Sequence, residues 1–107
     1  MVKKQRDALI AAWIEAAGLD ASMKSEFTAQ EKARVTKRAE QTVDKVIATY
    51  ALKRASGEMR DMTARFKEER VVNPKLVWAT FEREYLKKVV TATAQAQSER
   101  VKRGLPI

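Results

Sequence analysis

Apolar residues recur at helical spacing in three long stretches of this chain. The first stretch predicts a helix over about 4–17, because its apolar positions fall on one face of a helix: Leu9, Ile10, Trp13, Ile14 and Ala17. Gly18 is expected to cap the end of this helix, with Leu19 folding back onto the last turn. Residues 20–27 then form a connector with room for one short helical turn.

The second stretch has a clear helix start. Thr28 and Glu31 have the spacing of a capping box, in which each side chain bonds the other residue's backbone N–H group. We therefore predict a helix over about 28–56. Six apolar residues share one face of it and should be buried: Val35, Ala39, Val43, Val46, Ile47 and Tyr50.

The end of this helix has two interpretations. Ser56 and Gly57 favour a break, a separate helix over 58–70 and a compact four-helix bundle. However, apolar residues cross Gly57 at spacings of three and four: Leu52, Ala55, Met59, Met62 and Phe66. One glycine inside a helix costs only about 1 kcal/mol relative to alanine, so we expect one helix over 28–70. Its two halves would bury opposite faces, which indicates contacts between subunits.

The third stretch predicts a helix over about 74–103. Asn73 is a suitable N-cap, Pro74 suits the first helical position and Gly104 suits the end. The first half of this helix has a broad apolar face made of Val77, Trp78, Phe81, Tyr85 and Val89. Residues 91–98 are small and polar. Such a segment either packs closely against a neighbouring backbone or projects into solvent.

Composition agrees with a helical fold. The chain has 107 residues, of which only three are Gly and two are Pro, so little interrupts its helices. We predict a single all-α domain over 1–107, a bundle of three or four helices that is expected to oligomerise. No apolar run approaches the length of about 18 residues that a membrane span needs. A cytoplasmic location is therefore expected, or one within a virion or nucleoprotein particle, with no membrane partner.

The chain carries a net charge of +8, and the excess lies after residue 30. Four basic residues lie opposite the apolar face of the second helix and can neutralise phosphates: Arg34, Lys37, Arg38 and Lys45. The alternative is a solvated face, with ion pairs supplied by Glu31, Glu40 and Asp44. A second basic cluster, which also suits the dipole of a helix C-terminus, consists of Arg100, Lys102 and Arg103.

Residue types restrict the chemistry. The chain has neither Cys nor His, so thiolate and imidazole metal sites and Cys–His or Ser–His catalytic pairs are excluded. Its three glycines are isolated, so it has no glycine-rich phosphate loop. Carboxylate pairs such as Glu68 and Glu69 lie beside basic residues on faces expected to be exposed, where nothing would bury them for acid–base work. We expect no enzyme, cofactor, metal or small-molecule substrate.

Two functions remain. The first is a protein–protein interaction module (an assembly component, adaptor or inhibitor), which binds a partner or its own copies through apolar helical surfaces. Its candidate interface residues are Leu52, Met59, Met62, Phe66, Trp78, Phe81 and Tyr85. The alternative is a nucleic-acid-associated protein that binds phosphates through the two basic clusters. The small, basic, alanine-rich composition is typical of a bacterial or phage accessory protein. We favour the interaction module, because every helix shows more apolar surface than one small monomer needs, whereas the basic face has acidic neighbours.

Overall fold

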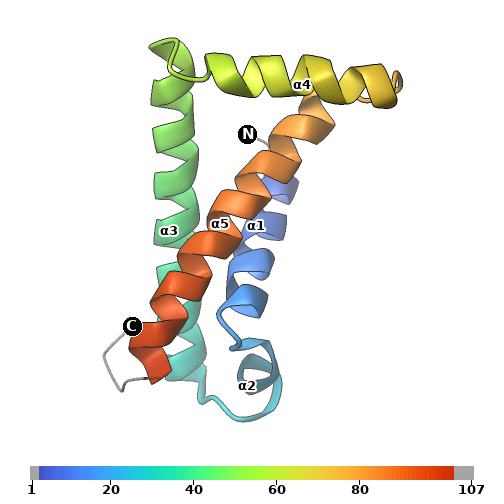
Figure 1. The fold of residues 1–107 in the computed structure, drawn as a ribbon. Helices are drawn as coiled ribbons and strands as arrows, with labels where there is room; N and C mark the ends of the chain where they lie inside the picture. Colours follow the sequence, from blue (N-terminus) through green and yellow to red (C-terminus); the bar gives the residue numbers. More distant parts are fainter. Residues whose placement is uncertain (1–2, 103–107) are drawn as a thin grey trace.

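The computed structural model describes residues 3–102, with side chains described as far as Gln97. The fold is all-α, as predicted. In this range it has five helices: α1 (Lys3–Ala16), α2 (Asp20–Ser25), α3 (Ala29–Ala55), α4 (Arg60–Val72) and α5 (Trp78–Lys102). Helices α1, α3 and α5 pack against one another, whereas α4 runs across one end of the molecule (Figure 1). The short helix α2 lies in the expected connector, which raises the number of helices above the predicted three or four.

Gly18 ends α1 as predicted. Its φ of 75° lies in the left-handed region, where a side chain is unfavourable. The N–H of Leu19 donates to the carbonyl of Ile14 at 3.1 Å, and the N–H of Gly18 donates to Glu15 at 3.0 Å. This pair of bonds is the Schellman motif, which satisfies the last carbonyls of the helix. It turns the chain so that Leu19 is buried.

The predicted capping box begins α3. The Thr28 hydroxyl accepts from the N–H of Glu31 at 3.2 Å, and the Glu31 carboxylate accepts from the N–H of Thr28 at 3.1 Å. This backbone N–H, followed by the hydroxyl, holds the pKa of Glu31 below its ordinary value. Two backbone N–H groups that the helix itself leaves unpaired are therefore satisfied, which fixes the position at which α3 begins.

The continuous helix expected over 28–70 is wrong, and the alternative break at Gly57 is present. Gly57 has a φ of 80°, and the N–H of Glu58 donates to the carbonyl of Lys53 at 2.9 Å. The apolar series across Gly57 does not form one buried stripe, because the Leu52 side chain is 72% exposed. After the break the chain changes direction, and Met62 is buried against the core.

The predicted start of the last helix at Pro74 is also wrong, because α5 begins four residues later at Trp78. Asn73 organises a turn instead of capping a helix. Its side-chain oxygen accepts from the N–H of Lys75 at 3.3 Å, and its carbonyl accepts from the N–H of Leu76 at 3.0 Å. Asparagine favours such turns because its side chain bonds the backbone two residues on. Residues 73–77 thus connect α4 to α5.

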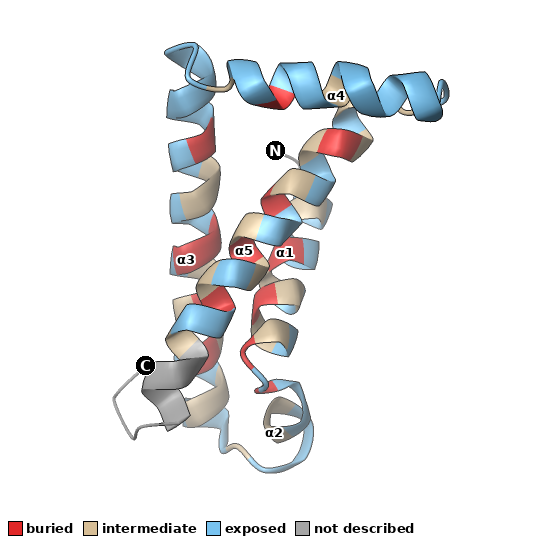
Figure 2. Cartoon of the chain, in the orientation of Figure 1, coloured by how far each residue is buried: buried red, intermediate tan, exposed pale blue. Residues whose placement is uncertain are grey.

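The core lies where α1, α3 and α5 face one another (Figure 2). Its largest fully buried side chains are Trp13, Val43, Leu86 and Val90. Burying such a side chain contributes about 1.5–3 kcal/mol relative to leaving it exposed. Within the segment expected to be small and polar, Ala94 is fully buried. This part of α5 therefore does pack closely against its neighbours.

Aromatic rings join α4 to the start of α5. The Phe66 ring meets the Trp78 ring edge-on, with centroids 5.1 Å apart, and the Phe81 ring at 5.4 Å. Such pairs contribute about 0.5–1.5 kcal/mol beyond the area they bury. The remainder of α4 is mostly exposed (Figure 2), and Met62 is its only buried residue.

Candidate functional site: a basic groove between α3 and α5

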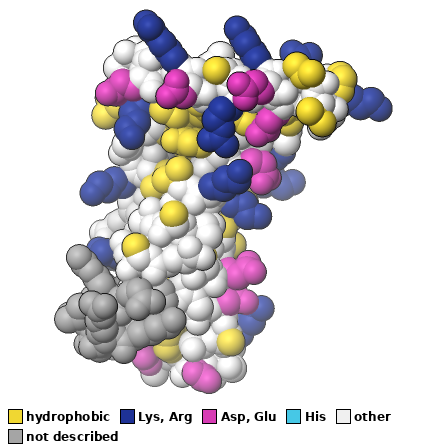
Figure 3. All heavy atoms as spheres, in the orientation of Figure 1, with side chains coloured by type: hydrophobic (Ala, Val, Ile, Leu, Met, Phe, Trp, Pro, Cys, Tyr) yellow, Lys and Arg dark blue, Asp and Glu magenta, His cyan; other side chains and the backbone are white. Residues whose placement is uncertain are grey.

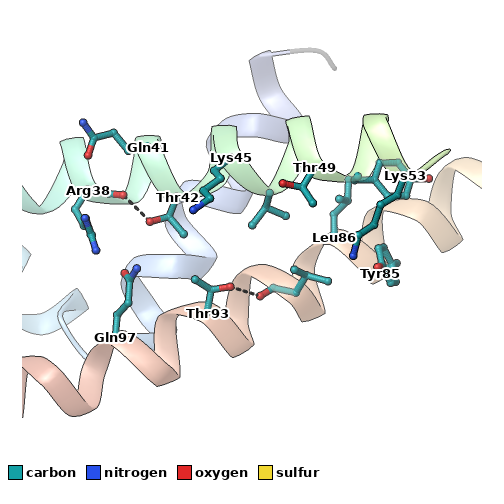
Figure 4. A pocket seen from close by; sticks show the side chains of 13 residues that line it. Arg38, Gln41, Thr42, Lys45, Thr49, Lys53, Tyr85, Leu86, Thr93 and Gln97 are labelled. Carbon is teal, nitrogen blue, oxygen red and sulfur yellow. Dashed lines mark hydrogen bonds between the residues drawn. The ribbon is translucent and has the colours of Figure 1, made fainter. Parts of the chain in front are cut away.

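A groove of about 410 Å³ runs between α3 and α5 (Figure 4). This is within the volume range of about 300–1,000 Å³ that is usual for small-molecule sites. Its apolar lining comprises Val46, Tyr50, Tyr85, Leu86 and Val89. Its polar lining comprises Arg38, Gln41, Thr42, Lys45, Thr49, Lys53, Thr93 and Gln97. The described residues that line the groove thus include three cations and no carboxylate.

Helix geometry explains why the cations line one wall. Arg38, Lys45 and Lys53 are seven and eight residues apart, which is about two turns each time. They therefore recur along the edge of α3 that faces α5. Thr42 and Thr49 lie between them at the same spacing, and the Thr42 hydroxyl donates to the carbonyl of Arg38 at 2.9 Å.

Two acidic residues of α3 lie on its other flank and pair with α1. Arg6 donates through Nε to Asp44 at 2.8 Å and through Nη2 to the second Asp44 oxygen at 3.1 Å. Glu40 is 3.8 Å from the same guanidinium. The hydrogen bond from Arg6 holds the pKa of the Asp44 carboxyl below its ordinary value. Two of the three carboxylates that could have paired with the basic face of α3 are thus engaged elsewhere.

The groove cations have no ion-pair partner among the side chains that the structure describes, which are those of residues 3–97. Arg38 and Gln97 point toward one another across the groove (Figure 4). The Nε of Arg38 and the Oε1 of Gln97 are both buried without a hydrogen-bond partner. Burying such groups unpaired is costly. This end of the groove therefore has unused capacity for polar contacts.

A hydrogen-bonded cluster joins α3 to α5 near Tyr50. One oxygen of Glu82 accepts from the Tyr50 hydroxyl at 2.5 Å, from Arg54 Nη1 at 3.0 Å and from Trp78 Nε1 at 3.2 Å. Burial, followed by the hydrogen bond to Glu82, raises the pKa of Tyr50 to about 12. Because Tyr50 stays protonated at neutral pH, it contributes no negative charge beside the cations of the groove.

The structure separates the basic residues predicted from the sequence. Arg38 and Lys45 line the groove, whereas Arg34 and Lys37 are exposed and lie outside its lining. Arg103 lies outside the described residues, and so do the side chains of Arg100 and Lys102. The predicted strip is therefore two surfaces, one inside the groove and one on the outer face of α3.

Most of the candidate interface residues are covered within the chain. Met62 and Phe81 are buried, and four others pack against the core as partly buried residues: Met59, Phe66, Trp78 and Tyr85. Tyr85 also lines the groove. Only Leu52 is largely exposed. Folding of one chain therefore already accounts for most of the apolar surface from which an interface was expected.

Sequence reasoning missed the opposite wall of the groove and one of its cations. Lys53 could have been found, because it continues the spacing of Arg38 and Lys45 by two further turns. Thr93 and Gln97 belong to the small, polar segment of α5. Nothing in the sequence pairs that segment with the basic edge of α3, since the contact depends on how the two helices cross.

The described parts of the molecule give no sign of other chemistry. Among the side chains of residues 3–97, no three Asp or Glu side chains gather in a way that could hold a metal ion. Within residues 3–102, no helix combines the length and apolarity of a membrane span. A comparison of the chain with known proteins gave no match among family models, curated proteins or solved structures.

Proposed function

We propose that this protein is a non-catalytic interaction module that binds an acidic segment of a protein in the groove between α3 and α5. The observation that carries the proposal is the lining of the groove, which holds three unpaired cations and no carboxylate among the described residues. A segment that brings carboxylates to Arg38, Lys45 and Lys53 would gain charge-assisted hydrogen bonds. The same contacts would favour this partner over neutral or basic ones.

The apolar side chains of the groove favour a protein segment over nucleic acid. Tyr50, Tyr85, Leu86 and Val89 lie beside the cations and suit the apolar residues of an amphipathic segment. Binding to a phosphate backbone depends instead on Lys and Arg contacts with several phosphates along the strand. On the face drawn in Figure 3, Lys and Arg side chains alternate with Asp and Glu around α4 and do not form a continuous basic surface.

Binding measurements test the proposal. A labelled helical peptide that alternates acidic and apolar turns would be titrated with the protein, beside the same peptide with Gln in place of Glu. Labelled single- and double-stranded DNA and RNA would be titrated in parallel. We expect the acidic peptide to bind, and Lys45→Glu combined with Lys53→Glu to weaken binding at least about tenfold, equivalent to about 1.4 kcal/mol.

The matched control is Lys87→Glu combined with Lys88→Glu, which makes the same charge change at exposed positions of α5 outside this groove. Both double variants should stay within about 0.5 kcal/mol of the parent in stability, because their positions are exposed. Nucleic acid that binds tightly and is released by Arg34→Glu with Lys37→Glu, but not by the groove variant, would overturn the proposal. It would support phosphate binding by the outer face of α3.

A further inference from the structure

Helix α4 is held to the rest of the molecule by few contacts. It has 13 residues, of which only Met62 is buried, and its N-cap residue Met59 makes no side-chain hydrogen bond to the helix. An isolated helix of this length is marginal in water. Figure 1 shows α4 running across the end of the bundle and ending beyond it. Most of its surface is therefore available to another molecule.

One exposed stripe of α4 carries both acidic and apolar side chains. Asp61, Glu68 and Val72 are seven and four residues apart, so they share one helix face. Val72 is 88% exposed, and Val71 beside it is 82% exposed. Neither Asp61 nor Glu68 makes an ion pair with any side chain that the structure describes. This stripe is an amphipathic acidic surface without a partner in its own chain.

The stripe and the groove have matching dimensions. Asp61 and Glu68 are about 10 Å apart along the helix axis, and Lys45 and Lys53 about 12 Å apart, at 1.5 Å per residue. Both walls of the groove are helices, whose backbone groups are already paired within each helix. They offer no edge to which an extended strand could bond, and a helix, which pairs its own backbone groups, suits such a groove.

We infer that the groove receives α4 of a second copy of this chain, with Asp61 and Glu68 facing Lys45 and Lys53. This inference rests on the proposed function, because it names the acidic segment that fills the same groove. The exposed valines would then lie against the apolar lining. Since stripe and groove are different surfaces, the simplest closed assembly is a reciprocal pair, in which each copy's α4 occupies the groove of the other.

A substitution at Arg65 of α4 provides a second test of this inference. It lies between Asp61 and Glu68 in sequence and at the border of the stripe, so it would approach the groove cations. Replacing it with Glu would remove one repulsive contact and add an attractive one. We expect Arg65→Glu to strengthen association several-fold. Lys67→Glu, which makes the same charge change at an exposed position on another face of α4, is the matched control and should leave association unchanged.

A pair of charge-reversed variants of the full chain tests the inference. One carries Lys45→Glu with Lys53→Glu, and the other Asp61→Lys with Glu68→Lys. Molar mass would be measured by sedimentation from micromolar to millimolar concentration, with circular dichroism to check that both variants are folded. The parent should associate and each variant alone should be monomeric. Their mixture should associate again, because each helix then meets a groove of opposite charge.

The outcomes separate this inference from the function on which it rests. A parent that stays monomeric while the acidic peptide binds in the groove would overturn docking of α4, and the proposed function would stand. A mixture that fails to associate while the parent does would overturn docking of α4 as well. If the parent associates, the mixture recovers association and the peptide competes with it, both proposals are supported. If neither the peptide nor a second copy binds, both are overturned.

Discussion

The two flanks of α3 both carry charged side chains in the sequence, but these side chains have different neighbours in the fold. On the flank toward α1, Asp44 and Glu40 both lie beside the guanidinium of Arg6, which pairs with them. On the flank toward α5, Lys45 and Lys53 face side chains that carry no opposite charge. The helix that packs beside each flank determines whether its charges are used within the fold or left for a partner.

This difference shows why a charged helix face cannot be interpreted from its own sequence. Asp44 precedes Lys45 in the chain, yet their side chains diverge by about 100° around the helix. One points toward an Arg of α1, and the other lines the groove with α5. Whether a basic residue is solvated, paired or available is therefore decided by packing partners that lie far away in sequence.

The largest expected effect is a loss of stability when the side chain that packs α1 into the core is removed. Trp13 is 1% exposed and is among the largest fully buried side chains. Trp13→Ala should cost about 3–5 kcal/mol, the range for truncating a buried aromatic side chain. That is a large share of the about 5–15 kcal/mol by which domains are stable. Urea unfolding followed by circular dichroism measures the loss.

A smaller change at the same position separates the effect of lost side-chain volume from the effect of the unpaired indole N–H. The indole N–H of Trp13 is buried without a hydrogen-bond partner, so Trp13→Phe leaves a smaller cavity and removes an unpaired donor. We expect it to cost much less than Trp13→Ala. Equal losses for the two variants would mean that Trp13 does not anchor α1 by filling space. The contrast between the two flanks of α3 would then need another explanation.

An effect of intermediate size on stability is expected at Glu82, which accepts a hydrogen bond from Tyr50 in the groove lining. Glu82→Gln removes the charge from the acceptor shared by Tyr50, Arg54 and Trp78. Hydrogen bonds to a charged group are worth about 1.5–3 kcal/mol each, and a neutral amide keeps part of them. We therefore expect a loss of about 1–3 kcal/mol in unfolding free energy.

An ultraviolet titration of tyrosine ionisation adds a second measurement on the same variant. The pKa of Tyr50 should fall from about 12 but stay above 10.0, because burial is the larger cause of its rise. Tyr50→Phe assigns the transition to this residue. A titration curve that Glu82→Gln leaves unchanged would contradict the hydrogen-bonded cluster. The site would then lose its link between α3 and the start of α5.

Local signals in the sequence predicted the helix ends that depend on a few neighbouring residues. Gly18 and the Thr28–Glu31 box are such cases, since each is satisfied by bonds within its own turn. The prediction failed at Gly57, where two local signals disagreed and packing of Met62 and Phe66 accompanies the break. It failed again at Asn73, because a helix cap and a turn use the same side-chain oxygen.

The groove could not be predicted from the sequence for a different reason. Arg38 and Lys45 were identified as a basic face, but the engagement of its acidic neighbour Asp44 depends on a contact with Arg6. That contact joins residues 38 positions apart in the chain. The spacing of residues within α3 therefore gives no indication of this contact. Helical spacing could identify which residues share a face, whereas the neighbour of that face followed only from the packed structure.

The smallest expected effect on stability is at Asp44, on the flank of α3 that pairs with α1. Asp44→Asn removes the charge that pairs with Arg6 and should lower stability slightly at neutral pH, because exposed ion pairs contribute little. Since the folded pKa of Asp44 is depressed, its contribution is full above the unfolded pKa of about 3.9 and is lost as pH falls through the folded pKa. The parent and the variant should therefore converge in stability once the pH falls below the folded pKa of Asp44.

Unfolding midpoints of both proteins from neutral to acidic pH measure this convergence. Glu69→Gln serves as the control, because Glu69 is exposed and makes no ion pair with the described side chains. A gap between parent and Asp44→Asn that stays constant down to acidic pH would mean that the pair with Arg6 is not formed in solution. The flank of α3 toward α1 would then carry unpaired charges like the flank toward α5, and the distinction between the two flanks would disappear.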